Sequence, residues 1–99
     1  MARQHNPPHP GEFIREVYLE PYKGKLSRSE VARHLRVSRS TFNRLVNEQS
    51  DLTSEMALRL SSVLGGSAES WLGMQMSYDL SKASKSVDLS KVEPISFAA

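Results

Sequence analysis

Apolar residues recur every three or four positions along most of this chain, and that period predicts α-helices rather than strands. A serine precedes three of the apolar runs at a position that suits a helix N-cap. Prolines and a glycine pair stop the runs, because proline lacks a backbone N–H and glycine readily adopts the conformation that ends a helix. Five helices are predicted, over residues 10–20, 28–35, 39–46, 53–64 and 68–81.

The second and third predicted helices have the pattern of a helix-turn-helix. Only Arg36 and Val37 separate the second helix from the next cap, so the two helices must cross steeply. Ala32 is the small residue that such a crossing needs. Val37, Phe42 and Leu45 are the apolar residues that lock the third helix onto the second. Arg36 stands where glycine is usual, so we expect either a slightly different turn or a left-handed residue that contacts phosphate.

The two ends of the chain depart from the helical pattern. Prolines in residues 1–9 impose an extended backbone. A polar run over residues 81–86 marks the end of a domain that covers residues 10–81. Residues 82–99 form a tail in which apolar and polar residues alternate as in a strand. Because a lone strand is unstable in water, the tail is expected either to pair with that of a second copy or to fray.

The composition describes one small domain. The chain has 99 residues, of which 38% are hydrophobic and none is cysteine, so one domain fills it and neither disulfides nor thiolate metal sites can form. No apolar run approaches the roughly 20 residues of a membrane helix, and the start of the chain lacks the apolar stretch of a signal peptide. We therefore expect a cytoplasmic protein without membrane association, whose thin core would gain stability from association of two copies.

Charge is distributed unevenly along the chain. The net charge is +2, but residues 1–50 carry +4 and residues 51–99 carry −2. Residues 23–44, which include the helix-turn-helix, hold seven basic side chains and one acidic side chain, a balance of +6. Basic runs are most often solvated helix faces. Together with the helix-turn-helix pattern, however, this concentration favours double-stranded DNA as the partner over an ordinary corner of two helices.

The docking geometry of a helix-turn-helix gives each polar residue of the third helix a role, because this helix enters the major groove with its N-terminal residues toward the base edges. Arginine suits guanine, and Asn43 suits adenine. The predicted base contacts are Arg39, Ser40, Thr41, Asn43 and Arg44. The predicted phosphate contacts, which flank the groove, are Arg28, Arg36, Ser38 and Asn47. For each residue the alternative is a solvated side chain.

The sequence predicts no catalytic chemistry. The histidines are isolated or separated by prolines, so no metal site is expected. Serines occur at helix caps and in the polar run rather than in an arrangement with His and Asp, and the carboxylates are scattered over amphipathic helices. We therefore expect a protein that is not an enzyme and has neither a cofactor nor a small-molecule substrate. A small hydrolase is the weakest of the functional hypotheses.

Several segments occur together in an order that is more specific than a helix-turn-helix alone. Residues 9–16 read His-Pro-Gly-Glu-Phe-Ile-Arg-Glu, residues 37–47 read Val-Ser-Arg-Ser-Thr-Phe-Asn-Arg-Leu-Val-Asn, and residues 54–60 read Ser-Glu-Met-Ala-Leu-Arg-Leu. The sequence Ser-Trp-Leu follows at residues 70–72. From about His9 to Leu80 the chain resembles HigA-type antitoxins, a family pattern that also includes stand-alone regulators called VapI-like or YbaQ-like.

This resemblance implies an all-α, five-helix fold of the cro/C1 type, which is lambda-repressor-like. It implies a homodimer that binds a palindromic operator and represses its own toxin–antitoxin operon. It also implies a partner toxin, HigB-like, of the RelE-type messenger-RNA endonuclease class. A stand-alone regulator without a toxin and a protein-interaction adaptor that has lost the DNA role are the alternatives.

A dimer is also favoured by the geometry of DNA. One helix-turn-helix reads only a few base pairs, whereas a two-fold dimer spans half-sites about 34–36 Å apart. The acidic second half of the chain is the expected interface, with candidate contacts at Met74, Tyr78, Val87 and Leu89. Trp71 is instead expected to fill the core of each copy.

Overall fold

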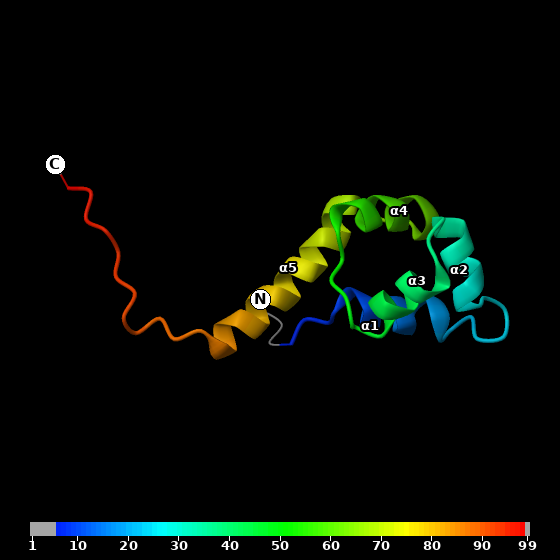
Figure 1. Ribbon diagram of the computed structural model, residues 1–99, viewed down its shortest axis with the longest axis horizontal. Helices are drawn as coiled ribbons and strands as arrows, with labels where there is room; N and C mark the ends of the chain where they lie inside the picture. Colours follow the sequence, from blue (N-terminus) through cyan, green and yellow to red (C-terminus); the bar gives the residue numbers. More distant parts are fainter. Residues whose placement is uncertain (1–5, 99) are drawn as a thin grey trace.

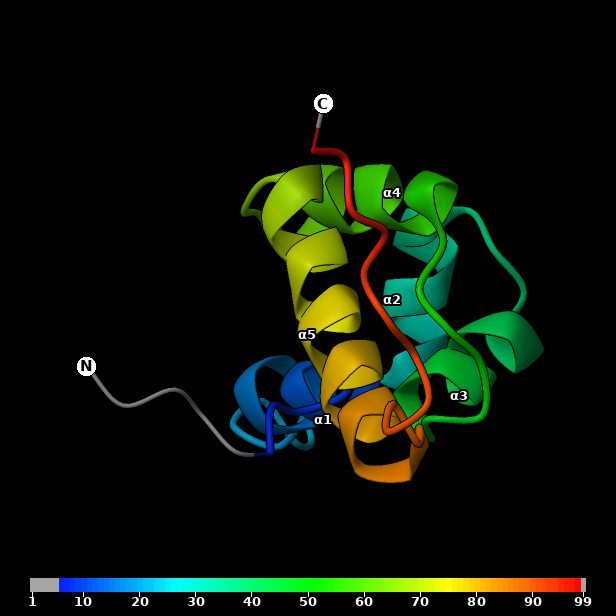
Figure 2. The same ribbon diagram turned by 90° about the vertical axis from the view of Figure 1, so that its left-hand side faces the viewer.

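The computed structural model describes residues 6–98 of the chain (Figure 1). It contains five α-helices and one π-helical turn, which are α1 (Pro10–Ile14), η1 (Arg15–Leu19), α2 (Arg28–Leu35), α3 (Arg39–Val46), α4 (Ser54–Leu64) and α5 (Ala68–Ser86). No strand occurs between residues 6 and 98, and the all-α prediction is confirmed. The pair α2 and α3 lies on one side of the molecule and α5 on the other (Figure 2).

Side-chain caps begin the helices at the predicted places. The Ser27 hydroxyl accepts a hydrogen bond from the Glu30 N–H at 3.1 Å, and the Glu30 carboxylate accepts one from the Ser27 N–H at 3.3 Å. These two bonds form a capping box at the start of α2. Ser38, Thr53 and Ser67 each accept a hydrogen bond from the N–H three residues further on, at the starts of α3, α4 and α5. Since one cap contributes about 1 kcal/mol, even the two-turn helices α2 and α3 begin at defined residues.

The hydrophobic core is shared by all five helices. Its buried members include Ile14, Leu35, Phe42, Leu60 and Trp71. The Trp71 indole N–H donates to the Gly65 carbonyl at 2.9 Å, at the C-terminal end of α4. The prediction that Trp71 fills the core is therefore confirmed, and its polar atom is satisfied by the helix end that it covers.

The contact between α1 and α3 is so close that it requires a glycine. A Cβ atom added to Gly11 would lie 2.0 Å from the carbonyl oxygen of Leu45 and 3.0 Å from that of Val46. No side chain fits there without moving the backbone at the end of α3. Gly11 thus fixes the distance between α1 and the last turn of α3.

His9 joins the N-terminal segment to α1 and α5. Its Nδ1 accepts a hydrogen bond from the Gly11 N–H at 2.9 Å and so caps α1. Its ring meets the Tyr78 ring edge to face, with centroids 4.9 Å apart. His9 itself is extended, with φ −65° and ψ 145°. Residues 1–5 of the segment predicted as extended lie outside the described residues.

The first predicted helix ends in a π-helical turn that the sequence did not predict. The Glu20 N–H donates to the Arg15 carbonyl at 2.8 Å, so the turn holds one residue more than an α-helical turn. Because the wider turn shifts the helical period, Val17 leaves the apolar side and is 42% exposed. Phe13, Ile14 and Tyr18 pack in or against the core, whereas Val17, which shares their helical spacing in the sequence, does not.

Helix α5 is longer than predicted and runs through the polar segment to Ser86. The hydroxyls of Ser84 and Ser86 donate to the carbonyls of Ser81 and Lys82, which keeps this segment compatible with a helix. The Lys85 ammonium also donates to the Asn6 side chain at 2.7 Å, so the N-terminal segment holds the end of α5.

The tail leaves the body at the end opposite to α2 (Figure 1). Residues 87–98 form neither helix nor strand, and the molecule reaches 61 Å along its longest axis. Hydrogen bonds from the Ser90 N–H and side chain lower the pKa of the Asp88 carboxyl. The Val92 N–H donates to the Leu89 carbonyl at 3.1 Å, so a turn interrupts the segment predicted as a strand, and the strand pairing predicted for the tail requires a second copy.

Candidate nucleic-acid interface

The turn between α2 and α3 has a left-handed residue, one of the two alternatives that the sequence left open. Arg36 adopts the left-handed conformation, with φ 62° and ψ 40°. The Val37 N–H donates to the Ala32 carbonyl at 3.1 Å, which ends α2 in the manner of a Schellman motif. Arg36 therefore takes the place of the usual glycine without a change in the type of turn, and its side chain is exposed.

Arg59 of α4 binds the end of α2 at this turn. Nη1 of Arg59 donates to the Leu35 carbonyl at 2.8 Å, and its Nε and Nη2 bind the Glu55 carboxylate at 3.2 and 3.0 Å. This contact satisfies one of the free carbonyls at the end of α2. The Glu55–Arg59 pair has the i,i+4 spacing that sequence reveals, but its role at α2 was not predicted.

The predicted base-contact residues lie together on the outer side of α3, opposite Phe42 and Leu45. Arg39, Ser40 and Arg44 are exposed, and Thr41 and Asn43 are half-buried. Ser38 precedes them at the cap, exposed as well. A continuous polar surface thus runs along the helix that the helix-turn-helix pattern assigns to the major groove.

Hydrogen bonds within α3 order several of these side chains before any partner binds. Nη1 of Arg44 donates to the Ser40 hydroxyl at 2.9 Å, and its Nη2 donates to the Thr41 hydroxyl at 3.4 Å. The Ser38 hydroxyl donates to the same Thr41 oxygen at 2.8 Å. The guanidinium of Arg44 therefore lies along the helix surface, next to the residues with which it is predicted to read bases.

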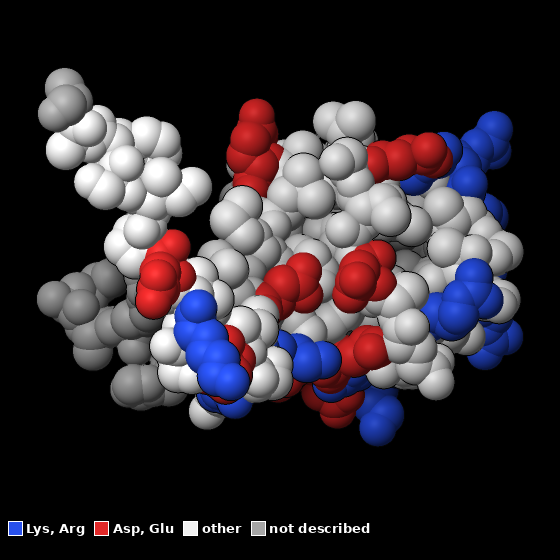
Figure 3. Space-filling view, turned by 60° about the vertical axis from the view of Figure 1, so that its left-hand side comes forward, with Lys and Arg blue, Asp and Glu red and all other residues white. Residues whose placement is uncertain are grey.

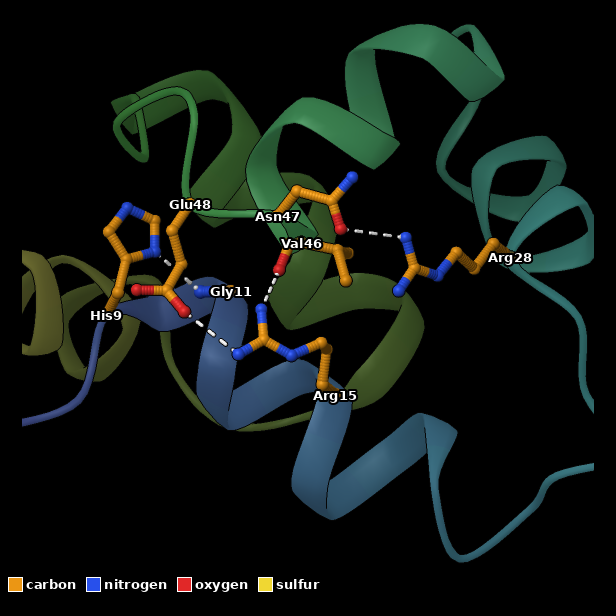
Figure 4. Close-up of polar contacts among 7 residues, drawn as sticks. All are labelled: His9, Gly11, Arg15, Arg28, Val46, Asn47 and Glu48. Carbon is orange, nitrogen blue, oxygen red and sulfur yellow. Dashed lines mark hydrogen bonds and ion pairs between the residues drawn. The ribbon is translucent and has the colours of Figure 1, made fainter.

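Arg28, one of the predicted phosphate residues, contacts two asparagines near the end of α3. From the first turn of α2 its Nη1 donates to Oδ1 of Asn43 at 3.3 Å and to Oδ1 of Asn47 at 3.1 Å; the second contact is drawn in Figure 4. The structure thus brings three of the predicted DNA residues into one polar cluster that joins α2 to α3.

Arg15 of η1 binds the C-terminal end of α3 (Figure 4). Its Nη1 donates to the Val46 carbonyl, and its Nη2 forms an ion pair with the Glu48 carboxylate at 2.9 Å. Glu48 itself has a positive φ of 61° just after the helix. Sequence reasoning missed Arg15, because no periodicity or motif links it to a residue more than thirty positions away.

Basic side chains gather at one end of the surface, and further ones lie among the acidic side chains elsewhere (Figure 3). In Figure 3 the Asp and Glu side chains spread across the middle of one face, whereas many Lys and Arg side chains gather along its right-hand edge. The basic residues of the helix-turn-helix segment are Lys23, Lys25, Arg28, Arg33, Arg36, Arg39 and Arg44. The uneven charge of the sequence therefore becomes a basic corner around α2 and α3, opposite the tail.

The predicted dimer contacts fall into two groups. Met74 and Tyr78 are half-buried, since Met74 packs against the core and Tyr78 against His9. Val87 and Leu89 in the tail are more than half exposed. Two further apolar residues of α5, Met76 and Leu80, are also more than half exposed, one helical turn apart on its outer side.

Two other features of the described residues bear on function. Within residues 6–98 no helix combines the length and the apolar character that crossing a membrane requires. No group of three or more His, Asp or Glu residues in that range is arranged to hold a metal ion.

Comparison with known proteins identifies the family. The Helix-turn-helix family model matches residues 17–71, which is more than half of the chain and includes α2, the turn and α3. This chain belongs to the helix-turn-helix family. Members of this type are DNA-binding regulators rather than a class of enzymes. The family range also contains the basic corner and α4, so the regulator fold and the candidate interface coincide.

The chain is similar to named regulators and to solved antitoxin structures. It is 49% identical to virulence-associated protein I of Dichelobacter nodosus over 75 residues, 76% of this chain and 68% of that protein. It is 39% identical to the HTH-type transcriptional regulator YddM of Escherichia coli, over 88% of this chain and 89% of that protein. The regulator is therefore related to VapI-type proteins over most of its length.

Among solved structures, antitoxin GraA in complex with its operator superposes with a TM-score of 0.82 at 30% identity, covering 97% of this chain and 98% of that chain. Pseudomonas aeruginosa antitoxin HigA with the higBA promoter gives a TM-score of 0.77 at 33% identity, covering 91% and 99%. The predicted cro/C1-type fold and the resemblance to HigA-type antitoxins are thereby confirmed.

Proposed function

We propose that this helix-turn-helix regulator is a dimeric repressor that binds a palindromic operator in its own promoter through α3. The proposed base contacts are Arg39, Ser40, Thr41, Asn43 and Arg44. The proposed phosphate contacts are Arg36, Ser38 and Asn47. Arg28 contacts both Asn43 and Asn47. The observation that carries the proposal is the exposed polar side of α3 on a corner with a charge balance of +6. The operator and promoter complexes of similar antitoxins support it.

Titration with salt tests DNA binding directly. Because basic side chains release counterions from phosphates, affinity for the promoter should fall by roughly a thousandfold or more between about 50 and 200 mM salt. Fluorescence anisotropy with a labelled promoter fragment measures this change, and a shuffled fragment of the same length and composition is the control. Absence of binding at low salt, or binding that salt does not weaken, would contradict the repressor function.

Dimerisation is proposed through the outer side of α5 and the tail. Met76, Leu80, Val87 and Leu89 are all more than half exposed within one copy, and a second copy is the occupant that a two-fold operator requires. Met74 and Tyr78 lie on the same helix and would border this contact.

We further propose that the protein is the antitoxin of a type II module and neutralises a HigB-like, RelE-type endonuclease. The similarity to structures named as antitoxins supports this proposal. The second candidate is a regulator without a toxin, which the similarity to the transcriptional regulator YddM favours.

Expression of the neighbouring reading frame distinguishes the two. An antitoxin should have beside its gene a short frame for a basic protein that stops growth when expressed alone, and growth should return when this chain is expressed with it. A neighbour without effect on growth would reject the antitoxin function and leave the repressor function in place.

A further inference from the structure

The contacts of Arg28 determine which atoms Asn43 can offer to a base. We propose that Arg28 is a positioning residue that fixes the amide of Asn43 so that this residue selects guanine over adenine. This inference rests on the proposed binding of α3 to DNA. It differs from the sequence-based expectation, in which Arg28 only contacts phosphate and Asn43 pairs with adenine.

One nitrogen atom of Arg28 holds two amides at once. Nη1 donates to Oδ1 of Asn43 at 3.3 Å and to Oδ1 of Asn47 at 3.1 Å; Asn43 lies on α3, and Asn47 is the C-cap residue that follows it. Arg28 and Asn43 are both half-buried. The contact is thus partly shielded from water, which strengthens a hydrogen bond from a charged donor.

The chemistry of the two groups permits only one orientation of the Asn43 amide. A guanidinium has donors and no acceptor, so an amide turned by 180° would place its NH₂ group against another donor. Since the oxygen and nitrogen of an amide diverge from its trigonal carbon, Oδ1 faces Arg28 and Nδ2 is directed to another side. Asn43 therefore presents two N–H donors to a partner while its oxygen is engaged inside the protein.

The orientation of the amide changes the base that Asn43 fits. Asparagine pairs with adenine by accepting from N6 and donating to N7, which requires a free Oδ1. Guanine instead presents two acceptors, N7 and O6, in the major groove. An outward NH₂ group matches guanine and meets the N6 donor of adenine unfavourably. At the base pair that faces Asn43, guanine is therefore preferred.

Base preference separates positioning from a simple phosphate contact. A phosphate contact carries no sequence information, so its loss weakens binding to all sequences alike and lowers the salt slope by about 0.9. Loss of a positioning residue instead frees the Asn43 amide to rotate and makes adenine acceptable. The two roles of Arg28 thus differ in which sequences are affected.

The test is Arg28→Met, which keeps an unbranched apolar stem and removes the donors of the guanidinium. Arg33→Met, on the exposed side of the same helix, removes an equal charge and is the matched control. Affinities are measured for a panel of operators in which each base pair is replaced in turn. We expect wild type and Arg33→Met to prefer guanine to adenine by about tenfold at one pair, and Arg28→Met and Asn43→Ala to lose this preference.

A measurement without DNA keeps the inference testable on its own. In ¹H–¹⁵N spectra of the free protein, Arg28→Met should shift the side-chain NH₂ signals of Asn43 and Asn47, and Arg33→Met should leave both in place. Unshifted signals, or an unchanged guanine preference in Arg28→Met, would overturn the inference. If the wild type bound no DNA, the proposed function and the base preference would fail together, while the NH₂ signals would still decide the Arg28 contact.

Discussion

At the scale of single residues, Arg36 combines backbone strain with an exposed charge in the turn of the helix-turn-helix. Its φ of 62° costs an L-residue about 1 kcal/mol that glycine avoids. We expect Arg36→Gly to raise the free energy of unfolding by roughly 0.5–1 kcal/mol, because part of the gain is lost to the greater freedom of glycine in the unfolded chain. Urea denaturation measures this change.

Arg36→Ala separates the charge from the strain, since alanine keeps the Cβ atom. We expect Arg36→Ala to give no such stabilisation. Both variants should weaken promoter binding about equally and lower the salt slope by about 0.9 if Arg36 contacts one phosphate. A glycine variant that is less stable than the wild type would show that the arginine side chain supports the folded turn.

Arg39 is the exposed first residue of α3 and the simplest test of base reading. Arg39→Ala should weaken binding to the promoter by about 1–3 kcal/mol and relax the preference at one base pair, because a bidentate contact to guanine is lost. The operator panel measures both effects. Equal weakening for every operator would instead assign Arg39 to phosphate.

At the scale of helices, the close approach of Gly11 to α3 links α1 to the position of the recognition helix. Gly11→Ala places a Cβ atom 2.0 Å from the Leu45 carbonyl, so we expect stability to fall by about 2–3 kcal/mol. Gly73→Ala is the matched control, since nothing lies within 4 Å of its added Cβ. This variant should gain about 0.5–1 kcal/mol from helix propensity. Thermal unfolding compares the two, and similar stabilities would mean that α1 shifts freely on α3.

The helix starts were predictable because their causes are local. Ser27, Ser38 and Ser67 cap helices through bonds to residues three positions away, and the left-handed turn follows from the short spacing between two apolar patterns. The π-helical turn and the last residues of α5 have no such signal in the apolar pattern, and the Lys85 ammonium bonds to Asn6, which lies 79 positions away. The same difference between local and distant causes applies at the candidate nucleic-acid interface. Sequence identified the residues of α3, but the orientation of Asn43 depends on an arginine from another helix.

At the scale of the whole molecule, the basic corner and the tail lie at opposite ends, and the molecule with its tail is 61 Å long (Figure 1). A dimer that joined the tails and the outer sides of α5 would leave both α3 helices exposed. Two such helices can meet half-sites about 34–36 Å apart, and the phosphate contacts of the two copies then add. The position of the basic corner thus suits a chain that uses one end for DNA and the other for its partner copy.

Removal of the tail after Ser86 tests this arrangement and spares α5, which ends at that residue. If residues 87–99 pair two copies, the shortened protein should sediment as a monomer at concentrations where the full chain is dimeric, since the apolar contacts of Val87 and Leu89 are lost. Its affinity for a complete operator should fall at least tenfold, while affinity for a single half-site should not change. Circular dichroism shows whether the shortened protein keeps its helices. A shortened protein that stays dimeric would remove the tail from the interface, and Met76→Glu would then show whether the outer side of α5 holds the two copies together.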